Sequence, residues 1–440
     1  MPLDLHPNCQ AQLRASLAEQ LARAGARHGM FLTPETSAYL FIAQSALPAT
    51  GRIHTRLLKL IGETPLVDFV SGTLARELFE TQEYRSASTP VSLTSISAYA
   101  DLDALAARLV MDFNSLPWEY TVTAPLPKEF SEVFCQNIGS MQLSDAVSIR
   151  RADKQFVNAF PLKAGIKKRD ESIAGGGGLL SSLLIGNKPT WANDLAYIQI
   201  FVEGFIGKFT TTEPLLDAIG VLRTFYGLAL ALRLLKPGST YHAYPEREKV
   251  YIHRQVEGAW VIEEVHELEP QRSEAIRDLK LHDLDGALDT DGKRTEWMQF
   301  QLSAIGSVLR AGDRARNVAL GAQWLLDSHC GSDELLQYIQ AAVVVEILLG
   351  DKASSDLAGL GELLSNRCAY LIATSHAQRS ELLQEFRHIY EVRSKIVHRG
   401  KSRLVLAERM LFNKLRWMCR RIIQEEVKLL EKDSPKGGGA

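Results

Sequence analysis

Phe386-Arg-His-Ile-Tyr-Glu-Val-Arg-Ser-Lys-Ile-Val-His-Arg-Gly400 is the most informative stretch of this 440-residue chain, because it reads as one helix with an abrupt end. Apolar residues recur at helical spacing along it, at Leu382, Phe386, Ile389, Ile396 and Val397. Arg393 falls on the same stripe. Gly400 suits the left-handed position that follows a helix, which places His398 in the last turn. The pattern predicts a helix over 380–398.

Arg393 and His398 are the candidate functional residues of this helix. A cation on a face that should be buried costs free energy unless it has a partner or a task. Five residues of helix are about 500° of rotation, so on a straight helix the two side chains point about 140° apart. They converge only if the helix distorts near its end, or if each faces across a two-fold axis between two copies of the chain.

Three segments, in order, resemble the signature helices of the HEPN superfamily in its ApeA-like branch. Tyr390-x-x-Arg393-Ser-x-Ile-Val-His398-x-Gly400 is similar to the last of these helices. Two earlier segments match in order and spacing, Val345-Glu-Ile-Leu-Leu349 and Glu362-Leu-Leu-Ser-Asn-Arg367-Cys-Ala-Tyr-Leu371. The resemblance covers about residues 295–432 and implies an all-α HEPN helical bundle.

The resemblance also implies an activity, which is metal-independent cleavage of RNA by an endoribonuclease at a dimer interface. In that chemistry the ribose 2′-OH attacks the adjacent phosphorus and leaves a 2′,3′-cyclic phosphate. A histidine acts as acid or base, and an arginine fork holds the phosphate and offsets its developing charge. Arg393 and His398 are then the catalytic pair, and Glu346 orients one of them. Ser394 stands where many active HEPN nucleases have Asn, Asp or His, although serine is usual in the ApeA-like branch.

Basic residues near the same helix end are the expected RNA contacts, namely Lys395, Arg399, Lys401 and Arg403. Residues 379–421 contain twelve Lys/Arg and four Asp/Glu, a local net charge of +8 in a chain with a formal net charge of −2. Such a segment favours a polyanionic partner, although a solvated helix face has the same composition. Proteins of this type resemble toxins or antiphage effectors. The expected partners are therefore RNA, a second copy of the chain, and a neutralising or trigger molecule at the N-terminal region.

Each candidate residue also has a structural interpretation. Arg393 can cap carbonyl groups or pair with a carboxylate, and His398 can be an ordinary residue at a helix end. Glu346, inside an apolar run, is expected to be buried and partnered, and its partner can instead be Arg367 or Arg387. The alternative function is a non-catalytic HEPN bundle that serves as a dimerisation or RNA-binding scaffold.

The residues before the bundle predict an α+β region, so the fold class is an α+β N-terminal region followed by an all-α HEPN helical bundle. Residues 1–285 are expected to have their own core, in one or two subdomains with a sensor or regulatory role. A Gly-rich loop at 163–190, a linker at 286–294 and a disordered tail at 433–440 complete the organisation. Strands are expected at 118–123, 145–150, 197–203, 249–255 and 260–266, the last two as a hairpin. Helices are expected at 13–24, 101–113, 212–235, 295–309, 313–328, 333–349, 357–373, 380–398 and 402–431.

Composition excludes several classes of protein. With 46% hydrophobic and 23% charged residues, the chain has the composition of a soluble globular protein. The most apolar long segment, 219–235, contains Arg223 and Arg233, which argues against a membrane span. Five cysteines are scattered without any Cys-x-x-Cys, which fits a reducing cytoplasm and argues against structural zinc. We therefore expect a cytoplasmic protein that uses no metal or other cofactor and has no membrane partner.

Overall fold

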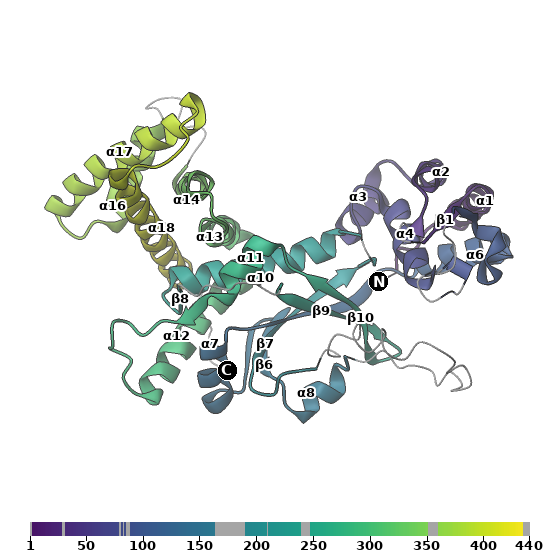
Figure 1. Ribbon diagram of the computed structural model, residues 1–440, viewed down its shortest axis with the longest axis horizontal. Helices are drawn as coiled ribbons and strands as arrows, with labels where there is room; N and C mark the ends of the chain where they lie inside the picture. Colours follow the sequence, from purple (N-terminus) through teal and green to yellow (C-terminus); the bar gives the residue numbers. More distant parts are fainter. Residues whose placement is uncertain are drawn as a thin grey trace.

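The computed structural model describes residues 2–28, 31–78, 81, 83–84, 89–162, 190–208, 210–238, 247–350 and 360–433. The molecule is elongated, with helices of the N-terminal part at one end, a sheet in the middle and C-terminal helices at the other end (Figure 1). The predicted layout of an α+β region followed by an all-α region is confirmed. The predicted Gly-rich loop and C-terminal tail lie outside the described residues, apart from Thr190 and Asp433.

Residues up to Leu116 form a mainly helical unit with its own apolar core. Its small antiparallel sheet has the strand order β2-β1-β3. The ring of Phe69 lies 5.2 Å from that of Phe113 and 4.8 Å from that of Phe205, which follows β7 of the central sheet. These aromatic contacts attach the unit to the sheet. Its elements are α1 (Pro7–Leu21), β1 (Gly25–Arg27), β2 (Phe31–Leu32), α2 (Pro34–Gln44), α3 (Gly51–Leu60), α4 (Pro65–Leu78), β3 (Val91–Ser92) and α6 (Leu102–Asn114).

The central sheet is antiparallel throughout, with the strand order β10-β9-β4-β7-β6-β5. The strands are β4 (Trp118–Pro125), β5 (Ser140–Ser144), β6 (Val147–Arg151), β7 (Ala196–Gly204), β9 (Lys249–Val256) and β10 (Ala259–Glu267). The predicted hairpin is confirmed, because β9 and β10 pair around a turn in which Glu257 and Gly258 both have positive φ. That is the backbone that a two-residue hairpin turn requires. The other predicted strands are found within a few residues of their expected bounds.

Helix α10 (Glu213–Ala231) joins the sheet to the C-terminal helices. It packs on β7 on one side and on α13 (Arg316–Asp327) on the other. A Cβ added at Gly227 would lie 1.8 Å from the carbonyl oxygen of Ala322, so the two helix backbones touch at this point. Among the described residues, α10 alone has the length and hydropathy of a membrane span, but 67% of its apolar window is buried. Such burial is typical of a core helix.

The C-terminal part is helical across its described residues, as the sequence predicts. Local signals set the helix ends: Asp333 caps α14, Ser375 caps α17, and Gly400 follows α17 in the left-handed conformation with φ 61°. The helices are α12 (Asp291–Arg310), α13, α14 (Glu334–Leu349), α16 (Leu360–Ile372), α17 (His376–Arg399) and α18 (Leu406–Asp433). Smaller elements before them are α7 (Lys128–Asn137), α8 (Lys154–Ala159), β8 (Leu235–Pro237), α11 (Pro270–Arg277) and β11 (Leu279–Leu281).

The predicted separation into two cores needs a correction. We expected residues 1–285 to have a core of their own, with a linker at 286–294. Instead, one cluster of buried apolar residues extends from the central sheet through α10 into α12, α13, α14, α17 and α18. Helix α12 also begins at Asp291, inside the expected linker. The cause is the two-sided burial of α10, because a helix that is apolar on opposite faces needs cover on both.

Candidate functional site

Helices α14 and α17 bring Glu346, Tyr390 and Arg393 together. The Glu346 Oε1 atom lies 3.2 Å from Nη2 of Arg393 and accepts a hydrogen bond of 3.0 Å from the Tyr390 hydroxyl. Tyr390 and Arg393 are three residues apart, so they share one face of α17, and the Arg393 Cζ atom lies 5.8 Å from the centre of the tyrosine ring. The carboxylate in the apolar run therefore has a partner, and that partner is Arg393.

Two further contacts position α17 against its neighbours, one against α14 and one against α16. The buried hydroxyl of Tyr338 on α14 donates a hydrogen bond of 2.9 Å to the carbonyl oxygen of Ile389 on α17. Gly361 of α16 leaves room for the Tyr390 ring, since an added Cβ would lie only 3.1 Å from its Cδ1 atom. Burial, and then the negative charge of Glu346, raises the pKa of Tyr390. The phenol therefore stays protonated and remains a donor to Glu346.

The Arg393 guanidinium keeps donors to spare. Its side chain is 23% exposed and that of Glu346 22%, so the ion pair is partly screened from water. The Arg393 Nε atom is buried and has no hydrogen-bond partner among the described residues. A guanidinium has five N–H donors, and one carboxylate oxygen does not satisfy them. The cation is thus oriented by Glu346 and can still accept a second anion.

His398 does not join this cluster within one chain. Helix α17 is α-helical through Arg399, so it contains no distortion that would turn His398 toward Arg393. The two side chains point about 140° apart, as expected for five residues of regular helix. The His398 side chain is exposed in the last turn, beside Gly400. The structure therefore unites Glu346 with Arg393 and leaves His398 exposed at the helix end, with no side-chain partner among the described residues.

Of the four residues expected to contact RNA, two lysines are partly buried and two arginines are exposed. The Lys401 Nζ atom lies 3.0 Å from Glu408, with only 20% of its side chain exposed, and the same carboxylate accepts the N–H of Val405. Lys401 therefore holds the α17–α18 connection in place, and its charge is already committed. Lys395 is partly buried. Arg399 and Arg403 are exposed and form no ion pair or hydrogen bond with their side chains among the described residues.

Exposed apolar side chains surround the same helix end. They are Leu336, Val397, Val405, Leu406 and Met410, and Leu406 is 74% exposed. An ion pair of 3.0 Å between Arg409 and Glu334 places the start of α18 beside the start of α14. Apolar residues gathered in this way are typical of a contact surface.

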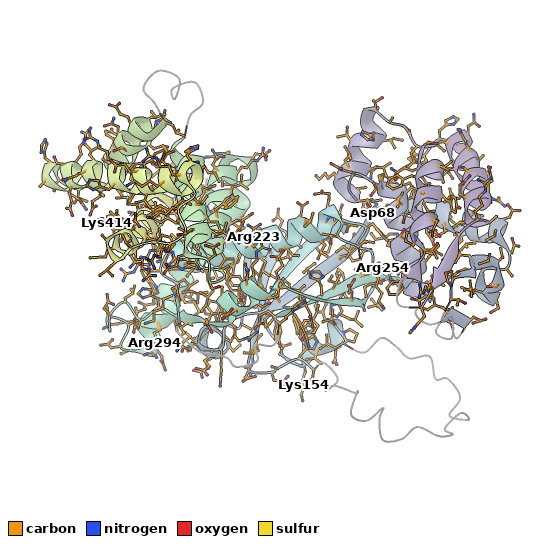
Figure 2. All side chains as sticks on the ribbon, turned by 45° about the horizontal axis from the view of Figure 1, so that its top comes forward. Asp68, Lys154, Arg223, Arg254, Arg294 and Lys414 are labelled. Atoms are coloured by element: carbon orange, nitrogen blue, oxygen red, sulfur yellow. The ribbon has the colours of Figure 1, made fainter. Side chains whose placement is uncertain are left out.

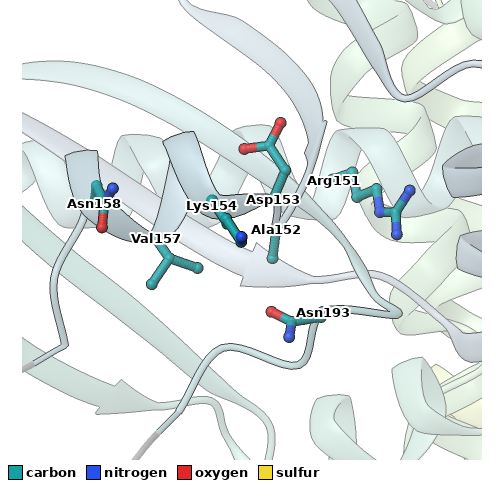
Figure 3. Close-up of a pocket in the computed structure, with 7 residues that line it drawn as sticks. All are labelled: Arg151, Ala152, Asp153, Lys154, Val157, Asn158 and Asn193. Atoms are coloured by element: carbon teal, nitrogen blue, oxygen red, sulfur yellow. The ribbon is translucent and has the colours of Figure 1, made fainter.

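A hollow of about 590 Å³ beside α8 is lined by Arg151, Lys154 and Asn193, together with neighbouring residues, and contains none of the predicted site residues (Figure 3). Within the described ranges, no group of three His, Cys, Asp or Glu side chains could hold a metal ion. All five cysteines are free thiols.

Comparisons with models of protein families, with curated proteins and with solved structures found no match to this chain. Sequence reasoning missed the roles of two tyrosines. Tyr390 could have been found from its position three residues before Arg393, whereas nothing in the sequence marks Tyr338 beyond its place in an apolar helix.

Proposed function

We propose that the C-terminal helices form a HEPN-type endoribonuclease that cleaves RNA without a metal ion and acts as a homodimer. One observation carries the proposal: a guanidinium oriented by Glu346 lies on the helix whose last turn exposes His398. These are the two kinds of group that cleavage by a ribose hydroxyl needs. The resemblance of the Tyr390–Gly400 segment to the HEPN signature helix assigns both residues to that reaction.

In the proposed reaction, the 2′-oxygen of the ribose forms a bond to the adjacent phosphorus, and the bond from phosphorus to the 5′-oxygen breaks. The products are a 2′,3′-cyclic phosphate and a free 5′-hydroxyl. Arg393 holds the phosphate and offsets the charge that develops on its oxygens. His398 carries the proton transfer, because imidazole exchanges protons near neutral pH. Arg399 and Arg403, which are exposed, contact the flanking phosphates.

A second copy of the chain completes the proposed site. Arg393 and His398 point in different directions in one chain, so a site that contains both takes one residue from each protomer. The exposed Val397, Leu406 and Met410 beside the helix end supply apolar area for such a contact. We therefore propose a homodimer through the C-terminal helices. The N-terminal unit would restrain the nuclease or sense its trigger, as in a cytoplasmic toxin or antiphage effector.

The decisive experiment incubates purified protein with RNA in EDTA and maps the fragment ends. Cleavage with 2′,3′-cyclic phosphate ends is expected, and His398→Ala should slow it by about 10²- to 10⁴-fold. Arg393→Ala should slow it as well and also weaken RNA binding, because a bidentate phosphate contact is lost. His398 is exposed and contributes little packing, so its variant should fold normally. Unchanged cleavage by His398→Ala would overturn the proposal.

Mixing the two inactive variants tests the shared site. If each site takes Arg393 from one protomer and His398 from the other, a mixed dimer contains one intact site. Equal mixing should then restore roughly a quarter of wild-type activity, since half of the dimers are mixed and each has one working site. No recovery in subunit-exchanged samples would mean that the site lies within one chain.

One observation favours the alternative, a non-catalytic scaffold. The Glu346–Arg393 pair is complete within a single chain and ties α14 to α17, as a structural ion pair would. The scaffold proposal predicts dimers that bind RNA without cleaving it. Intact RNA together with a dimer in light scattering would favour the scaffold, and a monomer at micromolar concentration would count against both proposals.

A further inference from the structure

One face of α18 crosses the ends of two other helices. Arg416, Arg420 and Gln424 are spaced four residues apart, so they lie on one face of the helix. Arg416 donates to the carbonyl oxygen of Ser328, just past α13, and Gln424 donates a bond of 2.6 Å to that of Ala231, the last residue of α10. Arg420 therefore lies between the ends of α13 and α10.

Two other basic residues, one past the end of each helix, come close to Arg420. His329 follows Ser328 past α13, and Arg233 follows α10 with a left-handed φ of 62° that is costly for a residue with a side chain. Arg233 has a distant carboxylate partner, Asp285 at 3.7 Å, whose side chain is 92% exposed. Figure 2 shows side-chain nitrogens gathered between Lys414 and Arg294, where α18 passes α12.

Arg420 itself is partly buried and has no ion pair or hydrogen bond from its side chain among the described residues. Helix C-termini attract cations, but here the carbonyl groups of Ser328 and Ala231 are taken by Arg416 and Gln424. Burial, and then the charge of Arg233, lowers the pKa of Arg420. Burial, followed by the charges of Arg416 and Arg420, lowers the pKa of His329 to about 3. Arg420 therefore lies near the positive charges of Arg233 and Arg416 without a counter-ion of its own among the described residues, which is costly in a partly dry site.

Aromatic side chains lie beside this cluster. The Trp297 Nε1 atom of α12 donates a hydrogen bond of 3.4 Å to the carbonyl oxygen of Arg233. Its ring stacks on that of Phe300 with centroids 6.1 Å apart, and Phe300 is 65% exposed. An exposed aromatic ring near an arginine that has no counter-ion among the described residues is a combination that suits a nucleotide, since the ring stacks on a base and the arginine holds phosphate.

We propose that Arg420 and Arg233 bind the phosphate of a nucleotide whose base stacks on Phe300, at a site formed by α18, α12 and the end of α10. Arg416 and His329 border the site, and Arg416 adds positive charge, whereas the lowered pKa of His329 leaves its ring neutral near pH 7. The phosphate belongs either to a free nucleotide or to single-stranded RNA, which share this chemistry. The proposal does not depend on nuclease activity, because none of these residues belongs to the Glu346–Arg393 cluster.

The test measures the binding of ADP and of pyrophosphate to the full chain by calorimetry. Arg420→Gln should weaken both about 10- to 100-fold, the value of a lost charge-assisted hydrogen bond. Arg421→Gln is the matched control, because Arg421 lies on the same helix but is already bound to Glu425 at 2.9 Å and to Gln424. Its effect should be under about twofold. Equal loss in both variants, or no binding by the wild type, would overturn the site.

A second variant separates the base from the phosphate and does not disturb the fold. Phe300→Ala removes an exposed ring, so it should weaken ADP and leave pyrophosphate unchanged. Unchanged ADP binding would refute the stacking contact. Competition experiments with bound pyrophosphate then distinguish the two sources of phosphate. Displacement of pyrophosphate by ADP but not by a short single-stranded RNA identifies a free nucleotide as the ligand, whereas displacement by the RNA identifies the RNA backbone. Arg420→Gln should melt no lower than wild type in phosphate-free buffer, because it removes an unpaired cation.

Discussion

Replacing Gly227 by alanine tests whether the central sheet and the C-terminal helices share one core. The new Cβ would meet the Ala322 carbonyl oxygen at 1.8 Å, whereas ordinary contact begins at 3.4 Å. Both groups belong to helix backbones, so no rotamer change relieves the clash, and α13 must move away by about 1.6 Å. Such a shift is large against the usual 8–10 Å between packed helix axes. We expect a loss of about 3 kcal/mol, the upper end of the range for overpacked cores.

Gly220 supplies the control on the same helix. A Cβ at Gly220 would lie 3.7 Å from its nearest neighbour among the described residues, the Gln323 side-chain nitrogen, which is ordinary contact. Alanine there should stabilise the chain by about 0.5–1 kcal/mol, because glycine is a poor helix residue. The assay is urea unfolding followed separately by signals from the sheet and from the C-terminal helices. If Gly227→Ala stabilises the chain as Gly220→Ala does, or leaves the C-terminal transition unchanged, the shared core is refuted.

Two further predictions concern polar groups. Glu346→Ala should cost about 2 kcal/mol, because it removes partners of both Arg393 and Tyr390 in a partly buried cluster. A double-mutant cycle with Arg393→Gln should give a coupling near 1 kcal/mol, and zero coupling would contradict the pairing. Burial lowers the pKa of His253 to about 4 in the folded chain. As pH falls from 6.5 toward 4, His253 therefore binds a proton in the unfolded chain but not in the folded one, and the free energy of unfolding drops by at most about 3 kcal/mol. In His253→Phe the urea midpoint should fall less between pH 7 and pH 4.5 than it does in the wild type. An equal fall in both proteins would contradict this prediction.

Local sequence patterns predicted most of the secondary structure. The apolar stripe and Gly400 predicted a helix over 380–398, and α17 spans His376–Arg399. Alternation of residue types predicted the strands, and the Glu257-Gly258 pair supplied the hairpin turn. Strand order and the packing of α10 between sheet and bundle could not be predicted in this way. They depend on contacts between residues far apart in the chain, and a one-dimensional pattern shows that α10 is apolar but not what covers it.

The candidate site shows the same limit at the level of single residues. A carboxylate in an apolar run must be partnered, so the sequence predicted that Glu346 has a cationic neighbour. Several arginines were suitable, and only the crossing of α14 and α17, fixed in part by Tyr338, selects Arg393. Lys401 and Arg403 are equivalent in sequence, two residues apart in a basic segment. Burial against Glu408 commits Lys401 to the fold and leaves Arg403 exposed.

Because α17 is a regular helix, the oligomeric state of the chain bears on whether the proposed nuclease or the non-catalytic scaffold is the better proposal. Over five residues a straight helix advances about 7.5 Å and turns about 140°, so Arg393 and His398 project from different sides of α17. A single chain can therefore bind an anion at Arg393 but does not place the histidine beside it. In the proposed dimer a neighbouring α17 end supplies the missing group, and the exposed Leu406 and Met410 provide apolar area for that approach. The proposed catalysis therefore requires dimerisation, whereas the proposed RNA binding at Arg399 and Arg403 needs only one copy.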